Sequence, residues 1–194
     1  MIITAALCWW DETPEVLADC IRGIANVADR VVALDGAYRR FPGGTAASDP
    51  SQAEAIRATA QEAGLDCLVL TPDRLWAGQL EKRTLLYQMA AIGSDWVVVV
   101  DADHVIHADR EAVRAEIESL GPEVECIAAP YPVPLDERRG DDQLYASPWH
   151  RDVAGHADEH RLFFRSFPGL RVEGRHWWVS AVRGVGVSVS RLVQ

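Results

Sequence analysis

The sequence predicts a single α/β domain, in which helices flank a mostly parallel central β-sheet. Apolar, β-branched runs alternate with helical segments through the first two-thirds of the 194 residues, the pattern of strand–helix–strand units. Residues 96–100 are apolar throughout, which is typical of a central strand that is buried on both faces. A chain of this length buries about 70% of its unfolded surface, so it needs no disulfide or structural metal.

Each element is predicted from its own local signals. Residues 2–7 form the first strand. Thr13 is a good N-cap and Pro14 suits the first position of the helix that follows, in which apolar residues recur at three-to-four spacing. Ser48 or Asp49, followed by Pro50, begins a second helix in the same way. The remaining predicted elements are strands at 31–34, 67–70, 96–100, 124–133, 162–164 and 179–189, and helices at 79–92 and 110–120.

Two of these predictions concern side-chain placement and loop length. The helix at 79–92 is expected to turn its apolar residues inward: Leu80, Leu85, Leu86, Met89 and Ala90. The segment at about 135–160 is polar, glycine-rich and long, which is typical of lids and binding loops.

Composition limits the partners of the protein. It carries 19 basic and 29 acidic residues, a net charge of −10, which disfavours nucleic acid and anionic lipid surfaces. The four cysteines are widely spaced without a CxxC pair, as expected for reduced thiols in a cytoplasmic protein. The N-terminus lacks the basic region of a secretory signal, and no apolar run is long enough to span a membrane.

The polar residues that follow the predicted strands indicate a site. Ligands of open α/β sheets bind beyond the carboxyl ends of the strands, where Asp35 and the pair Asp101 and Asp103 are expected. Two carboxylates one residue apart can share a divalent cation, and oxygen ligands suit Mg²⁺ or Mn²⁺. The alternatives for the pair are a solvated turn or a helix N-cap.

Four segments, in the expected order, resemble the GT-A glycosyltransferases, particularly small family-2-like bacterial and phage members. WVVVVDADHVI resembles their apolar strand with its DxD motif, and GQLEKRTLLYQMAAIGSDW the helix before it. RVVALDG resembles the second strand, and DEHRLFFRSFPGLRVEGRHWW is similar to a stretch that ends in a histidine followed by an acidic residue. The resemblance covers about residues 1–180. It departs at Trp177, where an acidic residue is usual, and at Ala37, where serine is usual.

The resemblance implies a GT-A-like, nucleotide-diphospho-sugar transferase fold over residues 1–194. Residues 1–105 would bind the nucleotide-sugar, and residues 106–194 would form the acceptor side, with a mobile loop at about 135–160. The implied activity is Mn²⁺- or Mg²⁺-dependent, hexosyltransferase-like transfer from a UDP- or GDP-linked donor, with inversion. The acceptor would be a glycan, a protein or a small molecule.

The resemblance also implies roles for the metal and nucleotide residues. Asp103 would ligate the metal, with His176 as a further ligand, and Asp101 would hold the ribose or a metal-bound water. Asp35 would contact the nucleobase. The alternatives are an interfacial histidine at position 176 and a turn-forming aspartate at position 35.

The phosphate contacts and the general base are implied in the same way. Lys82 and Arg83 would contact phosphate or base, the alternative being a solvated helix face. Asp158 or Glu159 would be the general base for the acceptor hydroxyl, unless both merely keep a loop soluble.

Three other functions remain open. VVVVDADHV matches the nucleophile motif of haloacid-dehalogenase-type phosphohydrolases, with Asp101 as nucleophile and Asp103 as acid/base, although that motif normally opens the fold. A non-catalytic sugar-nucleotide binder would have the same fold. A nucleotidyltransferase is disfavoured because no glycine-rich loop with a basic residue follows Leu7.

Overall fold

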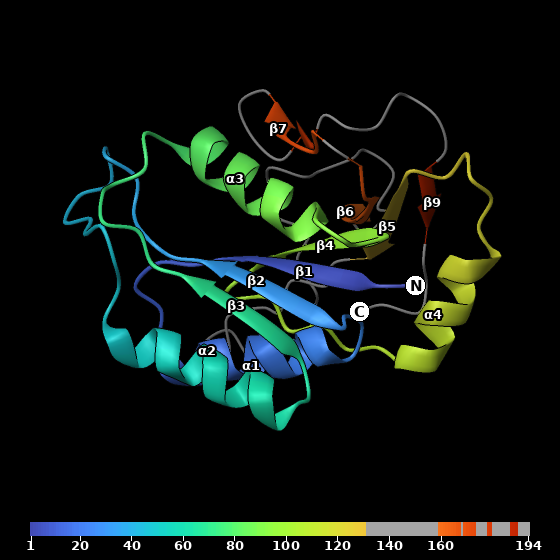
Figure 1. The fold of residues 1–194 in the computed structure, drawn as a ribbon, viewed down its shortest axis with the longest axis horizontal. Coiled ribbons are helices and arrows are strands. Elements are labelled where there is room, and N and C mark those ends of the chain that lie inside the picture. The colour runs from blue at the N-terminus through green and yellow to red at the C-terminus, as the bar shows by residue number, and fades with distance from the viewer. Residues whose placement is uncertain (131–158, 168, 174–177, 180–186, 190–194) are drawn as a thin grey trace, which may run out of the picture.

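The computed structural model describes residues 1–130, 159–167, 169–173, 178–179 and 187–189. Figure 1 shows the described strands and helices. The elements are β1 (Ile3–Cys8), α1 (Pro14–Ala25), β2 (Arg30–Leu34), α2 (Pro50–Glu62), β3 (Asp66–Leu70), α3 (Gln79–Ala91), β4 (Trp96–Asp101), α4 (Arg110–Ser119), β5 (Cys126–Pro130), β6 (Glu159–Arg165), β7 (Val172–Glu173), β8 (Trp178–Val179) and β9 (Val187–Val189).

One seven-stranded sheet has the order β3-β2-β1-β4-β6-β5-β9. The pairs β3–β2, β2–β1 and β1–β4 are parallel, whereas β6 runs antiparallel to both of its neighbours. Strands β7 and β8 form a separate antiparallel pair. The predicted fold class, a mostly parallel sheet flanked by helices, is therefore confirmed.

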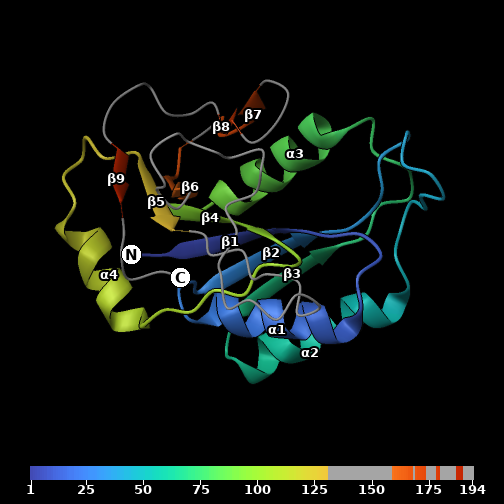
Figure 2. The same cartoon turned by 180° about the vertical axis from the view of Figure 1, so that it is seen from behind.

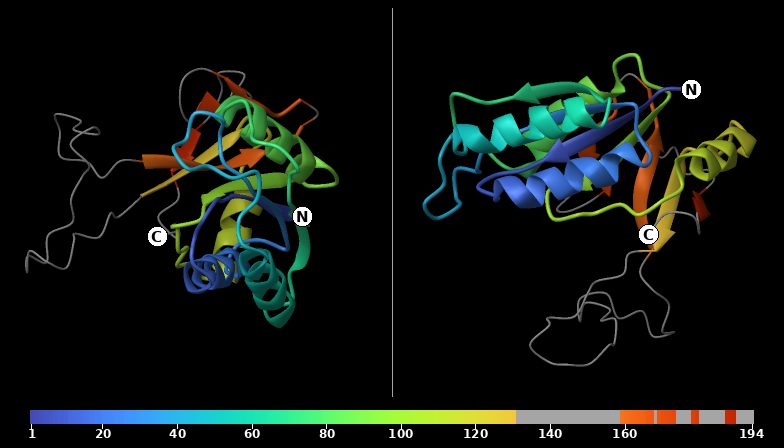
Figure 3. Two further views of the ribbon diagram at one scale, coloured as in Figure 1. Left: turned by 90° about the vertical axis from the view of Figure 1, so that its left-hand side faces the viewer. Right: turned by 90° about the horizontal axis from the view of Figure 1, so that it is seen from below.

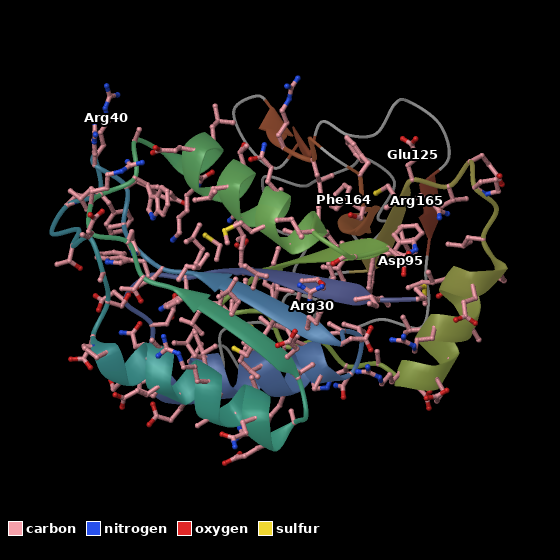
Figure 4. All side chains as sticks on the ribbon, viewed as in Figure 1. Arg30, Arg40, Asp95, Glu125, Phe164 and Arg165 are labelled. Carbon is pink, nitrogen blue, oxygen red and sulfur yellow. The ribbon has the colours of Figure 1, made fainter. Side chains whose placement is uncertain are left out.

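Helices cover both faces of the sheet. Helices α1 and α2 pack on one face and α3 on the other, as the side view in Figure 3 and the view from behind in Figure 2 show. Each face has its own apolar core. Arg165 of β6 lies over the ring of Trp96 at 4.6 Å, near Asp95 at the amino end of β4 (Figure 4). None of the described helices is long and apolar enough to cross a membrane.

The predicted helix starts are confirmed. The Thr13 side chain accepts a hydrogen bond from Val16 N, and Pro14 is the first residue of α1. Asp49, rather than Ser48, caps α2 by accepting from Ser51 N. These bonds satisfy main-chain donors that have no partner inside the helix.

The predicted inward face of α3 is wrong at two positions. Leu80 and Leu85 are exposed, while Leu86, Met89 and Ala90 pack against the core. The helix instead buries its two cations and Tyr87. The buried face of α3 thus includes Lys82 and Arg83, whose charged groups have hydrogen-bond partners beneath the helix.

Several predicted boundaries shift. The strand expected at 124–133 is β5, and the one at 162–164 is the longer β6. Of the stretch predicted as a strand at 179–189, Val179 ends β8 and β9 takes up the last three residues. Nearly all of the predicted loop at 135–160 lies outside the described residues, which resume at Glu159.

Candidate active site

The carboxyl ends of β1, β2 and β4 meet at one edge of the sheet, because these strands are parallel and adjacent. The loops after β2 and β3 extend beyond the same edge, at the left of Figure 1. Segment 9–12 follows β1, Asp35 and Gly36 follow β2, and segment 101–104 ends and follows β4. Ligand sites of open α/β sheets form at this edge.

Asp101 and Arg83 form an ion pair that is largely shielded from water. Arg83 Nη2 lies 2.6 Å from Asp101 Oδ1, and the two side chains are 9% and 16% exposed. The Arg83 Nη1 also donates to the Tyr87 hydroxyl, at 3.5 Å. The structure thus brings two sequence-predicted residues together, and it excludes the solvated helix face considered for Arg83.

Asp103 has a different environment, although it stands only two residues further on. Its side chain is 76% exposed, and its Oδ1 lies 3.8 Å from His104 Nε2. The first aspartate of the motif is therefore held by the protein, while the second faces solvent and is accessible to a ligand.

The main chain of Asp101 packs against α1. The Cys20 thiol donates to the main-chain oxygen of Asp101, at 3.7 Å. Burial, and then the charges of Asp103, Asp101 and Glu12, raise the pKa of Cys20 to about 12. The Cys20 thiol therefore stays protonated at neutral pH.

Glu12 was not predicted as a site residue, yet it lies within electrostatic reach of the motif. Burial, followed by the charges of Asp103 and Asp11, raises the pKa of the Glu12 carboxyl. The main chain here is anchored by Ser48 Oγ, which accepts from Asp11 N, and by Gln52 Oε1, which accepts from Glu12 N. The available signal was an acidic pair, Asp11-Glu12, in the segment that follows the first strand.

Asp35 lies at the predicted edge, where its carboxylate organises the following loop. It is buried and accepts hydrogen bonds from Gly36 N, Ser48 N and Ser48 Oγ, at 2.6–2.7 Å. Its main-chain oxygen accepts from the indole of Trp76. These contacts match the turn-forming alternative for this residue.

Lys82 is 1% exposed, so the solvated helix face considered for it is also excluded. Its Nζ donates to the main-chain oxygens of Trp9 and Gly36, both at 2.7 Å, and lies 5.7 Å from the ring of Tyr38. Burial lowers the pKa of this ammonium group. Lys82 ties α3 to the ends of both β1 and β2.

The other predicted site residues are not brought to this edge by the described structure. His176 and Asp158 lie outside the described residues, and Glu159 is placed only by its main chain, at the start of β6. Within the described part of the chain, no three His, Cys, Asp or Glu side chains are grouped to hold a metal. Mg²⁺ is often held by only one or two carboxylates together with substrate phosphates, and Asp103 fits that arrangement.

Comparison with known proteins supports the fold. No protein-family model matches the sequence, and no curated protein matches it. Among solved structures, the chain is similar to 4-diphosphocytidyl-2C-methyl-D-erythritol synthase from Anaerococcus prevotii, with a TM-score of 0.55 and 10% identity. The match covers 98% of this chain and 88% of that one. At this identity the likeness shows the fold alone, a GT-A-like α/β arrangement.

Proposed function

We propose that this protein is a metal-dependent glycosyltransferase that moves a sugar from a UDP- or GDP-linked donor to an acceptor, with inversion. The observation that carries the proposal is the contrast within the motif after β4. Asp101 is held by Arg83, whereas Asp103 is exposed at the edge where α/β sheets bind ligands.

The roles proposed for Asp101 and Asp103 rest on these environments. Asp103 would hold Mn²⁺ or Mg²⁺ together with the donor phosphates, and His176 is the proposed further ligand. The cation would stabilise the negative charge of the departing diphosphate. Asp101, oriented by Arg83, would accept a hydrogen bond from the ribose.

Asp35 and Lys82 would act on the nucleotide through the loops that they hold. The carboxylate of Asp35 holds Ser48, which in turn bonds Asp11 N. Lys82 holds the main-chain oxygens after β1 and β2. Together they fix the shape of the edge on which a base and ribose would lie.

The general base is proposed to be Asp158 or Glu159. Its carboxylate would take the proton of the acceptor hydroxyl while that oxygen attacks the sugar carbon from the side opposite the diphosphate. The loop at about 135–160 is proposed to close over the donor and exclude water.

Two alternatives are weighed by particular observations. Nucleotidyl transfer is the alternative that fits the name of the similar structure, a synthase of a diphosphocytidyl compound. In this chain, however, β1 is followed by Trp9-Trp10-Asp11-Glu12 rather than by a glycine-rich loop. A phosphohydrolase would need Asp101 as its nucleophile. Against this, one oxygen of that carboxylate is already engaged by Arg83.

The proposal is tested by thermal unfolding with UDP, GDP, CTP, UDP-sugars and GDP-sugars, each with and without Mn²⁺. A ligand at one hundred times its Kd adds about 2.7 kcal/mol, which raises the Tm by several degrees. Asp103→Asn should abolish a metal-dependent shift. Asp66→Asn is the matched control, because Asp66 is 79% exposed at the opposite end of the strands.

The same experiment separates the alternatives. Stabilisation by a nucleoside diphosphate or its sugar only with metal, followed by release of the diphosphate from that sugar, supports the glycosyltransferase. If CTP is the one nucleotide that stabilises the protein, the glycosyltransferase proposal is replaced by nucleotidyl transfer. No shift with any nucleotide would overturn the proposal.

A further inference from the structure

We propose that His104 is a positioning residue for Asp103, and that it acts by closing the turn after β4 without ligating the metal. The inference rests on the proposed function, since it assigns the metal to Asp103. His104 directly follows the motif, and neither the motif nor the resemblance gave it a role.

The first observation is that His104 bonds the main chain of Asp101 twice. His104 N donates to the main-chain oxygen of Asp101 at 3.0 Å. In return, Asp101 N donates to His104 Nδ1 at 3.3 Å. These two bonds enclose Ala102 and Asp103 in a short turn, so the exposed carboxylate of Asp103 stands on a main chain that is fixed at both ends.

The second observation is that the hydrogen bond from Asp101 N implies one tautomer of the His104 ring. A main-chain N–H can only donate, so the Nδ1 that faces Asp101 N carries a lone pair. A neutral imidazole has one donor and one acceptor nitrogen, and its hydrogen is therefore on Nε2. A ligating nitrogen needs a lone pair, which the Nε2 of this tautomer lacks. The nitrogen that lies 3.8 Å from Asp103 Oδ1 is thus an N–H group.

The third observation is that the remaining sides of the turn are already packed. Ala102 is buried, the Cys20 thiol bonds Asp101 O, and Gly23 of α1 lies against the segment that follows. A Cβ on Gly23 would come within 2.5 Å of Ile106 N. The His104 side chain, 12% exposed, closes the turn from within the segment itself. Without the His104 side chain, the turn that carries Asp103 would lose one of its two closing hydrogen bonds.

The test uses three substitutions and the affinity for Mn²⁺, measured by electron paramagnetic resonance once with UDP and once with GDP present. His104→Asn keeps an acceptor near the position of Nδ1, whereas His104→Gln and His104→Ala do not. Partners that orient metal ligands are worth 10–100-fold in metal affinity. His104→Asn should therefore bind within about threefold of the wild type, and the other two at least tenfold more weakly.

Two controls keep the test specific. His107→Ala removes an exposed histidine three residues away and should bind Mn²⁺ as the wild type does. The Tm of each variant without ligand shows whether the fold is retained. An equal loss in His104→Asn and His104→Ala would mean that the imidazole itself ligates the metal, and it would overturn the inference. Wild-type affinity in all three variants would overturn it as well.

A second measurement needs no variant. The ¹⁵N chemical shifts of the His104 ring in the metal-free protein should show a protonated Nε2 and an unprotonated Nδ1. The reverse assignment would overturn the inference even if the variants do not fold. If the wild type binds no Mn²⁺ with any nucleotide, the proposed function fails. Binding that is insensitive to His104 defeats this inference alone.

Discussion

The guanidinium of Arg83 and the carboxylate of Asp101 form an ion pair at 2.6 Å, beneath a turn whose other aspartate faces water. Arg83 reaches the pair from α3, and Asp101 ends β4, so the contact joins a covering helix to the central sheet. The pair makes the two aspartates of one motif chemically different.

Arg83→Met should lower the free energy of unfolding by about 3 kcal/mol, because it leaves a largely buried carboxylate without its counter-charge. The double variant Arg83→Met/Asp101→Asn should recover part of that loss, since both charges are then absent. Urea unfolding of the two single variants and the double variant measures the coupling. Additive losses would show that the ion pair does not contribute to stability.

Lys82→Met should destabilise the protein by about 2 kcal/mol, because the carbonyl oxygens of Trp9 and Gly36 lose a buried donor. It should also weaken nucleotide binding, since both carbonyls belong to the edge of the site. Arg40→Met is the control, because Arg40 projects into solvent from the loop after β2 (Figure 4). Chemical denaturation and the nucleotide-induced rise in Tm give both readouts. Equal stability of the two variants would contradict the assigned contacts.

The raised pKa of Cys20 predicts a loss of stability at alkaline pH. Well below pH 9 the thiol is protonated in both the folded and the unfolded state, and its titration does not affect stability. Between pH 9 and 12 the unfolded thiol ionises while the folded thiol keeps its proton, so stability falls by up to about 4 kcal/mol. Cys20→Ser removes this titration and should flatten the decline. Urea midpoints measured from pH 8 to 11 check it, and parallel curves for both proteins would refute the assignment.

Gly23→Ala should destabilise the protein, although alanine is the better helix former by about 1 kcal/mol. The added Cβ would lie 2.5 Å from Ile106 N, a main-chain atom that cannot move aside without shifting the segment after β4. Ala18→Gly, on the same helix, gives the ordinary cost of glycine. Thermal unfolding of both variants separates the two effects. A rise in Tm for Gly23→Ala would mean that the close approach is relieved at little cost.

The fold was predictable from local signals, because strand and helix periodicities and the caps at Thr13 and Asp49 act within a few residues. The inward face of α3 was not predictable in the same way. Counting apolar residues favoured Leu80 and Leu85, whereas the helix buries Lys82 and Arg83. Long cationic side chains can bury their stems when their charged ends find acceptors. Here the acceptors are the main-chain oxygens of Trp9 and Gly36, which follow β1 and β2, and the carboxylate of Asp101 in β4.

The candidate site shows the same limit. The pattern of strands predicted that the motif lies at the carboxyl edge of the sheet. The spacing of Asp101 and Asp103 does not show which of the two carboxylates forms an ion pair inside the protein. That difference depends on Arg83, which is distant in sequence. Glu12 was not predicted because the charge of Asp103, in the turn after β4, comes close to it only in the folded protein. The role proposed for His104 depends on hydrogen bonds that only the folded turn displays.

The strand order has a consequence for the protein during its synthesis. β1 can pair with β2 once both have left the ribosome, but its other edge pairs with β4, which follows β2 by some sixty residues. The second edge of β4 pairs with β6, which is synthesised later still. Until then the growing chain displays an unpaired, strongly apolar strand edge, the kind of surface that self-associates. A nascent chain stalled before β4 should therefore bind chaperones more strongly than the complete chain does.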